Sequence, residues 1–139
     1  MDQNTPLKHQ TVLIIEDELP FRQIYRDILR LDGYTVLEAE DGEEALKMIE
    51  AQLPDLILLD LVMPKMSGFD VLAELKKSPA FSSVPVVVYS ILNDKKEIDR
   101  AISMGANDYT VKGETPAREV LAKIKALLPE PPTAATPSV

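Results

Sequence analysis

Five short apolar runs alternate along the chain with segments in which apolar residues recur every three or four positions. The runs lie at residues 12–15, 35–39, 56–59, 86–88 and 109–111. The run from Leu56 to Leu59 is too short for a helix and too apolar for an exposed strand, so it predicts a central strand buried on both faces. Strands that alternate with helices pair in parallel through right-handed crossovers, with helices on both faces of one sheet. The pattern predicts an α/β protein of five strand-helix units.

The intervening segments have the start and stop signals of helices. Asp41 with Glu44 three residues later has the spacing of an N-cap with a capping box, and Asp94 with Glu97 repeats that spacing. Gly105 is a stop signal. The apolar residues at helical spacing are expected to face the core: Phe21, Ile24, Tyr25, Ile28 and Leu29; Ala45, Leu46, Met48 and Ile49; Phe69, Leu72 and Leu75; Ile98, Ala101 and Ile102; and Ala117, Val120, Leu121, Ile124, Leu127 and Leu128.

Length and composition fit one folded domain. The chain has 139 residues, of which 45% are hydrophobic. We expect a polar leader at 1–10, the domain at 11–128, and a disordered tail at 129–139, where prolines are frequent and no periodicity is visible. No run approaches 18 apolar residues and the start has no apolar signal segment, so we expect a soluble, cytoplasmic protein without membrane contact.

Charge and residue content exclude several classes of function. The net charge of −8, without a cluster of Lys and Arg, argues against nucleic acid as a partner. The absence of cysteine excludes disulfides and thiolate chemistry. A single histidine, His9, cannot form a histidine metal site and is expected to be a solvated leader residue.

Polar side chains follow four of the five predicted strands. Glu16 and Asp17 follow the first strand, Asp60 the third, Ser90 the fourth and Lys112 the fifth. Each taken alone has an ordinary explanation, since a carboxylate, hydroxyl or lysine at a strand end is commonly a solvated turn residue. Because parallel strands have their carboxyl ends at one edge of the sheet, we expect these five side chains to converge there, where ligands bind in open α/β sheets.

The chemistry of this group points to a phosphoryl site. Three close carboxylates need a neutralising cation, and oxygen ligands without His or Cys select a hard ion, Mg²⁺ or, as a substitute, Mn²⁺. Lys112 and the Ser90 hydroxyl can hold an anion beside that ion. Asp60 is then the candidate acceptor, because a carboxylate can form an acyl phosphate without a general base. The chain has neither a G-x-x-x-x-G-K nor a G-x-G-x-x-G loop, which favours a phosphorylated protein or small phosphodonor over ATP.

The order of motifs resembles that of the receiver domains of two-component response regulators, the CheY-like family. The similar stretches, between about Thr11 and Leu128, are the pair Glu16-Asp17, LILLDLVMPKMSG, VVVYS and GANDYTVKG. This resemblance implies a flavodoxin-like (βα)5 three-layer sandwich with strand order 2-1-3-4-5. It further implies that Asp60 is the phosphoacceptor and that Mg²⁺ is bound by Glu16, Asp17, Asp60 and the Val62 backbone carbonyl.

The resemblance also implies how a signal is passed on. A histidine kinase or phosphotransfer protein would donate the phosphoryl group, Lys112 would contact it, and Ser90 and Tyr109 would act as switch residues. The face made by the fourth helix, fifth strand and fifth helix would then change and control a downstream partner, with homodimerisation on phosphorylation as a common family behaviour. Such a domain is not an enzyme and assists only its own phosphorylation and dephosphorylation. The sequence identifies neither the kinase nor the target, and leaves open a stand-alone protein or a fragment of a larger regulator.

Four positions depart from the common family pattern. Gly113 replaces the usual proline after Lys112, which makes a cis peptide there less secure. Ile91 replaces a small residue and could crowd the approach to the acceptor. Val62 and Leu92 are apolar and cannot orient an attacking water, which predicts a long-lived phospho-form.

The departures around Lys112 and Ser90 leave one alternative open, and two other classes of protein are poorly supported on separate grounds. The alternative is a pseudo-receiver that binds a partner without phosphorylation. A haloacid-dehalogenase-like phosphatase needs a second Asp where this chain has Val62. A flavin-binding flavodoxin-like protein needs an anion loop where Glu16 to Glu18 would repel phosphate.

Overall fold

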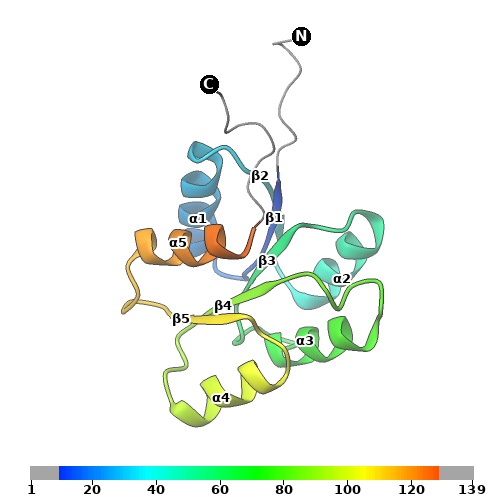
Figure 1. Ribbon diagram of the computed structural model, residues 1–139. Coiled ribbons are helices and arrows are strands. Elements are labelled where there is room, and N and C mark those ends of the chain that lie inside the picture. Colours follow the sequence, from blue (N-terminus) through cyan, green and yellow to red (C-terminus); the bar gives the residue numbers. More distant parts are fainter. Residues whose placement is uncertain (1–9, 129–139) are drawn as a thin grey trace.

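The computed structural model describes residues 10–128, which form one parallel five-stranded sheet with five helices (Figure 1). The strand order is β2-β1-β3-β4-β5, so the predicted flavodoxin-like architecture is confirmed. The predicted tail and nearly all of the predicted leader lie outside the described residues. The elements are β1 Thr11–Ile15, α1 Leu19–Leu31, β2 Thr35–Ala39, α2 Gly42–Ala51, β3 Leu56–Leu59, α3 Gly68–Lys77, β4 Val86–Ser90, α4 Lys95–Ser103, β5 Asp108–Val111 and α5 Ala117–Leu127.

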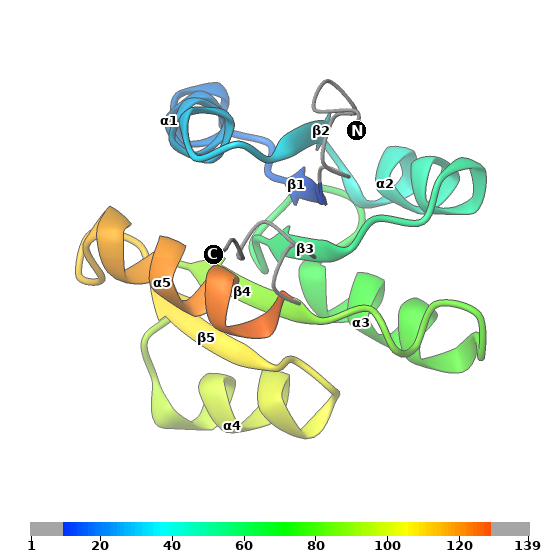
Figure 2. The same ribbon diagram turned by 45° about the horizontal axis from the view of Figure 1, so that its top comes forward.

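The helices cover both faces of the sheet, and the sheet separates two clusters of core residues (Figures 1 and 2). On one face, α1 and α5 pack against alternate strand residues such as Ile14 and Leu58. On the other face, α2, α3 and α4 pack against their neighbours, such as Leu13 and Ile57. All four residues of β3 are buried, as expected for the central strand. The alternating side chains of β3 therefore contribute to both cores.

The register of the strands aligns the ends from which the polar residues emerge. Ile15 of β1 pairs with Leu59 of β3, and the amide of Asp60 donates to the carbonyl of Ile15 at 3.0 Å. At the other side of the sheet, Ser90 pairs with Val111, and the amide of the next residue, Lys112, donates to the Ser90 carbonyl at 2.9 Å. The ladder thus extends one residue beyond the strands and places the polar residues at one edge.

The structure corrects details of the predicted helices. Ile24 and Ile102, expected on buried faces, are 48% and 44% exposed, because the apolar stripe of each helix is narrower than the sequence spacing suggests. Asp94 lies at the N-cap of α4, but its side chain makes no capping hydrogen bond within residues 10–128. Asp41 does cap α2 by accepting from the amide of Glu44 at 2.8 Å.

The predicted capping box at α2 is also shifted by one residue. The side chain of Glu44 accepts from the amide of Glu40 at 2.8 Å and not from the cap residue Asp41. A complete capping box occurs instead at α3, between Ser67 and Asp70, where none was predicted. The first turn of α3, which follows the loop from Asp60, is therefore firmly fixed.

Gly68 allows the first turn of α3 to pack directly against the end of β3. A Cβ atom at this position would overlap the carbonyl oxygen of Asp60 and lie 2.7 Å from Cα of Leu61. The Gly68 amide donates to the Leu61 carbonyl at 3.0 Å. This close approach holds the loop after Asp60 in place. Within residues 10–128, no helix has the length and apolar character needed to cross a membrane.

Candidate functional site

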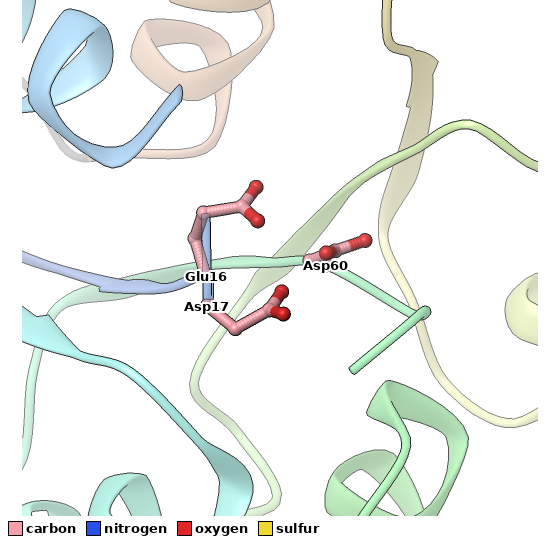
Figure 3. A group of neighbouring side chains, drawn as sticks. All are labelled: Glu16, Asp17 and Asp60. Carbon is pink, nitrogen blue, oxygen red and sulfur yellow. The ribbon is translucent and has the colours of Figure 1, made fainter. Parts of the chain in front are cut away.

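Three carboxylates lie together at the carboxyl edge of the sheet. Glu16 and Asp17 directly follow β1, and Asp60 directly follows β3, the strand beside it. One carboxylate oxygen from each lies within 4.8 Å of the others, and the three side chains extend from the chain toward the same side (Figure 3). Glu16 and Asp60 are buried, and Asp17 is half-buried. Adjacent parallel strands in the observed register therefore bring these acids together across 44 residues of sequence.

Lys112 contacts this acidic group from the end of β5. Its Nζ lies 2.8 Å from Glu16 Oε1 and 3.3 Å from Asp60 Oδ2, and its side chain is only 4% exposed. A third carboxylate oxygen, Glu18 Oε1, is 3.9 Å away. The ammonium therefore compensates part of the buried negative charge, which a low-dielectric site requires.

The electrostatics of the site follow from burial and from this compensation. Burial raises the pKa of Glu16 to about 7, although its bond to Lys112 opposes the rise. Burial also raises the pKa of Asp60, against the attraction of Lys112 and the amide of Val62. Burial would lower the pKa of Lys112, but Glu16 and Asp60 outweigh it and the pKa is raised. The cluster holds more negative charge than one ammonium offsets.

The acidic group fits a hard divalent cation. Asp17 Oδ1 is buried and has no hydrogen-bond partner among residues 10–128, a costly arrangement for a carboxylate oxygen. Glu16 Oε2 accepts from the amide of Glu18 at 3.1 Å, and Asp60 Oδ1 from the amide of Val62 at 3.1 Å. Both acids are thus held in place while the Asp17 oxygen is left for a ligand. Oxygen donors of this kind suit Mg²⁺ or Mn²⁺.

The two predicted switch residues lie on neighbouring strands, one fully buried and one partly buried. Ser90 ends β4 and is fully buried, and its Oγ accepts from the amide of Leu92 at 3.2 Å. Tyr109 lies on β5, half-buried, and its hydroxyl donates to the carbonyl of Leu92 at 2.7 Å. The loop residue Leu92 therefore links the two side chains. The roles of both residues remain predictions, as does ligation by the Val62 carbonyl.

The positions that depart from the family pattern surround the site. Val62 is 46% exposed and Ile91 61% exposed. Leu92 is partly buried against the core on the α3 face. The Lys112-Gly113 peptide is not cis, and Gly113 has φ +82°, which glycine adopts readily.

Sequence reasoning missed residues that support the site. Arg22 donates from Nη1 to the carbonyl of Glu16 at 2.7 Å and pairs through Nε with Glu38 at 3.1 Å. Phe21 and Tyr89 lie beside Lys112 with their rings facing its ammonium. Phe21 was interpreted as a core residue, and an aromatic side chain at helical spacing gives no sign of a charged neighbour. Arg22 does carry a sequence signal for a supporting role, because it is a basic residue at the start of a helix next to an acidic segment.

Comparison with known proteins identifies the family. The sequence model of the family 'response regulator receiver domain' matches residues 12–125 of this chain. "Probable transcriptional regulator ycf27" of Guillardia theta is 39% identical over 119 residues, which are 86% of this chain and 45% of that protein. The phosphate regulon transcriptional regulatory protein PhoB of Pseudomonas aeruginosa is 34% identical over 119 residues, 86% of this chain and 52% of PhoB. The chain thus spans about half the length of these relatives.

Solved structures agree with this result. The chemotaxis protein CheY4 of Vibrio cholerae superposes with a TM-score of 0.81 at 26% identity, covering 87% of this chain and all of CheY4. The receiver domain of a signal transduction histidine kinase from Syntrophus aciditrophicus gives a TM-score of 0.79 at 29% identity, covering 94% and 96% of the two chains. This chain belongs to the response regulator receiver domains, the signalling domains of two-component systems.

Proposed function

We propose that this receiver domain is a phosphorylation-activated switch in which Asp60 accepts a phosphoryl group from a histidine kinase or phosphotransfer protein. The observation that carries the proposal is that Asp60 lies beside an acidic pair and a buried lysine at the carboxyl edge of the sheet. Glu16, Asp17, Asp60 and the Val62 carbonyl are the proposed ligands of Mg²⁺, with Mn²⁺ as a substitute. The bound ion would offset negative charge on the carboxylates and on the transferring phosphoryl group.

The residues of the chain supply position and charge for the transfer. A carboxylate oxygen of Asp60 forms a bond to phosphorus while the bond from phosphorus to the donor's nitrogen or oxygen breaks, and the leaving group departs with that electron pair. The amide of Val62, 3.1 Å from Asp60 Oδ1, holds the carboxylate in one orientation. Lys112, already 3.3 Å from Asp60 Oδ2, turns to the phosphoryl oxygens and stabilises their charge. The donor carries the binding site for any nucleotide.

The output surface of the proposed switch is made by α4, β5 and α5. A phosphoryl group on Asp60 would take a hydrogen bond from Ser90, whose hydroxyl now accepts from Leu92. The bond between Tyr109 and the Leu92 carbonyl would then be exchanged for a new arrangement of that loop. New charge and hydrogen bonds favour one of two arrangements through their different contacts in each. The partner of this surface is a protein or a second copy of the chain.

The partner of the domain itself is proposed to be protein and not nucleic acid. The net charge of the chain is −8, which disfavours contact with phosphate backbones. The ycf27 and PhoB relatives are described as transcriptional regulators, and this chain matches about half of each. Control of transcription would therefore act through a part of the regulator that the matched segment does not include.

Homodimerisation on phosphorylation is tested by light scattering of the beryllofluoride form.

The phospho-form is expected to be long-lived. Val62 is 46% exposed beside the acceptor, and neither Val62 nor Leu92 offers a group that could orient a water for attack on the acyl phosphate. Val62→Asn adds a side-chain amide at this position and should speed loss of phosphate several-fold. Release of phosphate from the isolated phospho-protein measures both rates, and decay of the wild-type form within seconds would contradict the expectation.

A pseudo-receiver that signals without phosphorylation is the alternative. Titration with Mg²⁺ and beryllofluoride, followed by NMR, separates the two. The proposed function predicts saturable shifts at the amides of Val62, Ser90 and Tyr109 that need both components. A pseudo-receiver predicts no shifts beyond those of Mg²⁺ alone.

A further inference from the structure

Two aromatic rings face the ammonium group of Lys112. Its Nζ lies 4.5 Å from the centroid of the Phe21 ring and 5.4 Å from that of the Tyr89 ring. Phe21 belongs to the first turns of α1 and Tyr89 to β4, and their rings meet edge to face with centroids 5.9 Å apart. The ammonium therefore has carboxylates on one side and aromatic faces on another.

We propose that Phe21 and Tyr89 form an aromatic seat that positions Lys112 for phosphoryl transfer to Asp60. This inference rests on the function proposed above and adds to it two positioning residues. Neither ring touches the reacting atoms, and both act through the lysine.

The physical basis is the attraction between a cation and the negative face of an aromatic ring. The side chain of Lys112 is 4% exposed, so the ammonium has lost most of its hydration and depends on its neighbours. Of its two close carboxylate partners, Glu16 and Asp60, the second becomes an acyl phosphate in the proposed transfer. The ring contacts do not depend on the state of Asp60 and persist through the change. The seat thus keeps the ammonium at the site while it moves from carboxylate to phosphoryl oxygens.

The backbone at Lys112 does not by itself fix the direction of the Lys112 side chain, which depends on the contacts that the side chain makes. The Lys112 amide donates to the Ser90 carbonyl at 2.9 Å, but the following residue is Gly113, at φ +82°, where a Cβ atom would meet no other atom within 4 Å. The Tyr89 ring in turn packs edge to face against the ring of Tyr25, with ring centroids 4.7 Å apart and ring planes at 64°. The seat is therefore a supported structure, and the lysine is the part that it restrains.

The test separates an aromatic face from apolar packing. Phe21→Leu and Tyr89→Leu remove a ring and keep an apolar side chain, whereas Phe21→Tyr and Tyr89→Phe keep the ring. Tyr34→Leu is the matched control, because Tyr34 packs against the same core just beyond the far end of α1. All variants are made in the full chain, and their thermal unfolding is compared first.

A first readout reports the seat without any phosphoryl chemistry. Protons on the terminal methylene of Lys112 lie near a ring face, so their NMR resonances should be shifted upfield by the ring current. Phe21→Leu should return them toward the position of an exposed lysine, and Phe21→Tyr and Tyr34→Leu should leave them in place. Unshifted resonances in the wild-type protein would refute the seat.

A second readout tests its role in transfer. With acetyl phosphate as donor and saturating Mg²⁺, Phe21→Leu and Tyr89→Leu should each lower the rate constant of phosphorylation about threefold to tenfold. Phe21→Tyr and Tyr89→Phe should restore it, and the affinity for Mg²⁺ should be unchanged in all. Equal rates in Phe21→Leu and wild type, or an equal loss in Tyr34→Leu, would overturn the positioning role.

The two readouts also separate the seat from the function on which it rests. A wild-type protein that accepts no phosphoryl group would refute the proposed function and, with it, the positioning role. The upfield Lys112 resonances would then still establish the contact itself.

Discussion

The helices α3 and α4 are both followed by strands of the same sheet, yet they are attached to it very differently. α3 buries five residues, among them Phe69 and Leu72, and its first turn has a complete capping box. α4 buries one residue, Ala101, and Asp94 at its N-cap makes no side-chain capping bond within residues 10–128. A cation-π contact at 3.9 Å between Arg100 and the ring of Phe69 joins the two helices.

The strand that precedes α3 and the strand that follows α4 differ in burial in the same way. Every residue of β3 is buried, whereas in β5 only Thr110 is. The proposed acceptor, Asp60, directly follows the fully buried strand, and the proposed output surface includes the less buried β5 and α4. This arrangement teaches how one small domain can combine a fixed acceptor with a movable surface, because elements with little buried apolar area open at low cost in free energy.

Truncation of one apolar residue in each helix should give the largest contrast. Leu72→Ala removes a fully buried side chain of α3 and should lower the free energy of unfolding by about 3 kcal/mol. Ile102→Ala acts on a side chain of α4 that is 44% exposed and should cost about 0.5 kcal/mol or less. Urea denaturation of the two variants measures both values. Equal losses would show that α4 is as firmly packed as α3.

The pH dependence of stability should reveal the cost of burying carboxylates at the carboxyl edge of the sheet. The pKa of Glu16 is about 7 in the folded protein and near 4.5 in a model peptide, so the folded state binds more protons between these values. The free energy of unfolding in EDTA should therefore fall, by on the order of 1–2 kcal/mol, as the pH rises from 5 to 8. Asp60, whose pKa is also raised, adds to the same trend.

Two changes test the origin of this pH effect. Glu16→Gln should flatten the curve, because the titrating group is gone. Added Mg²⁺ should restore stability at pH 8 in the wild-type protein, since a cation favours the ionised carboxylates. A slope that is unchanged in Glu16→Gln would assign the effect to other residues.

The smallest contrast concerns the helix caps. Ser67→Ala removes the hydrogen bond that the Ser67 hydroxyl accepts from the Asp70 amide at the start of α3, and should cost about 1 kcal/mol. Asp94→Ala at the matching position of α4 should cost about 0.5 kcal/mol or less, since only its charge near the helix terminus is lost. Thermal unfolding of the pair at equal pH provides the comparison, and a larger loss for Asp94→Ala would be inconsistent with the observed cap.

Most of the fold could be predicted from the sequence because strong local signals agree with one another. The run from Leu56 to Leu59 identified the central strand, and alternation of strands and helices identified parallel pairing. The wrong predictions were that Ile24 and Ile102 are buried and that the side chain of Asp94 caps its helix. These depend on how a helix is rotated against the sheet, which spacing alone does not determine.

The sequence predicted which residues of the candidate site lie together, but not all of the contacts that their side chains make. Parallel strands bring their carboxyl ends to one edge, so the convergence of Glu16, Asp60 and Lys112 followed from topology. The contacts of Lys112 with Phe21 and Tyr89 depend on the packing of α1 against β4, and neither ring has a sequence signal that separates it from core.

The proposed function depends above all on Asp60 as the acceptor. Intact-mass measurement of the wild-type protein after incubation with acetyl phosphate and Mg²⁺ should show the gain of one phosphoryl group, and removal of Mg²⁺ with EDTA should prevent it. Asp60→Asn, with the same shape and no nucleophilic carboxylate, should show none. A phosphoryl group on Asp60→Asn, or none on the wild-type protein, would contradict the proposed role of Asp60.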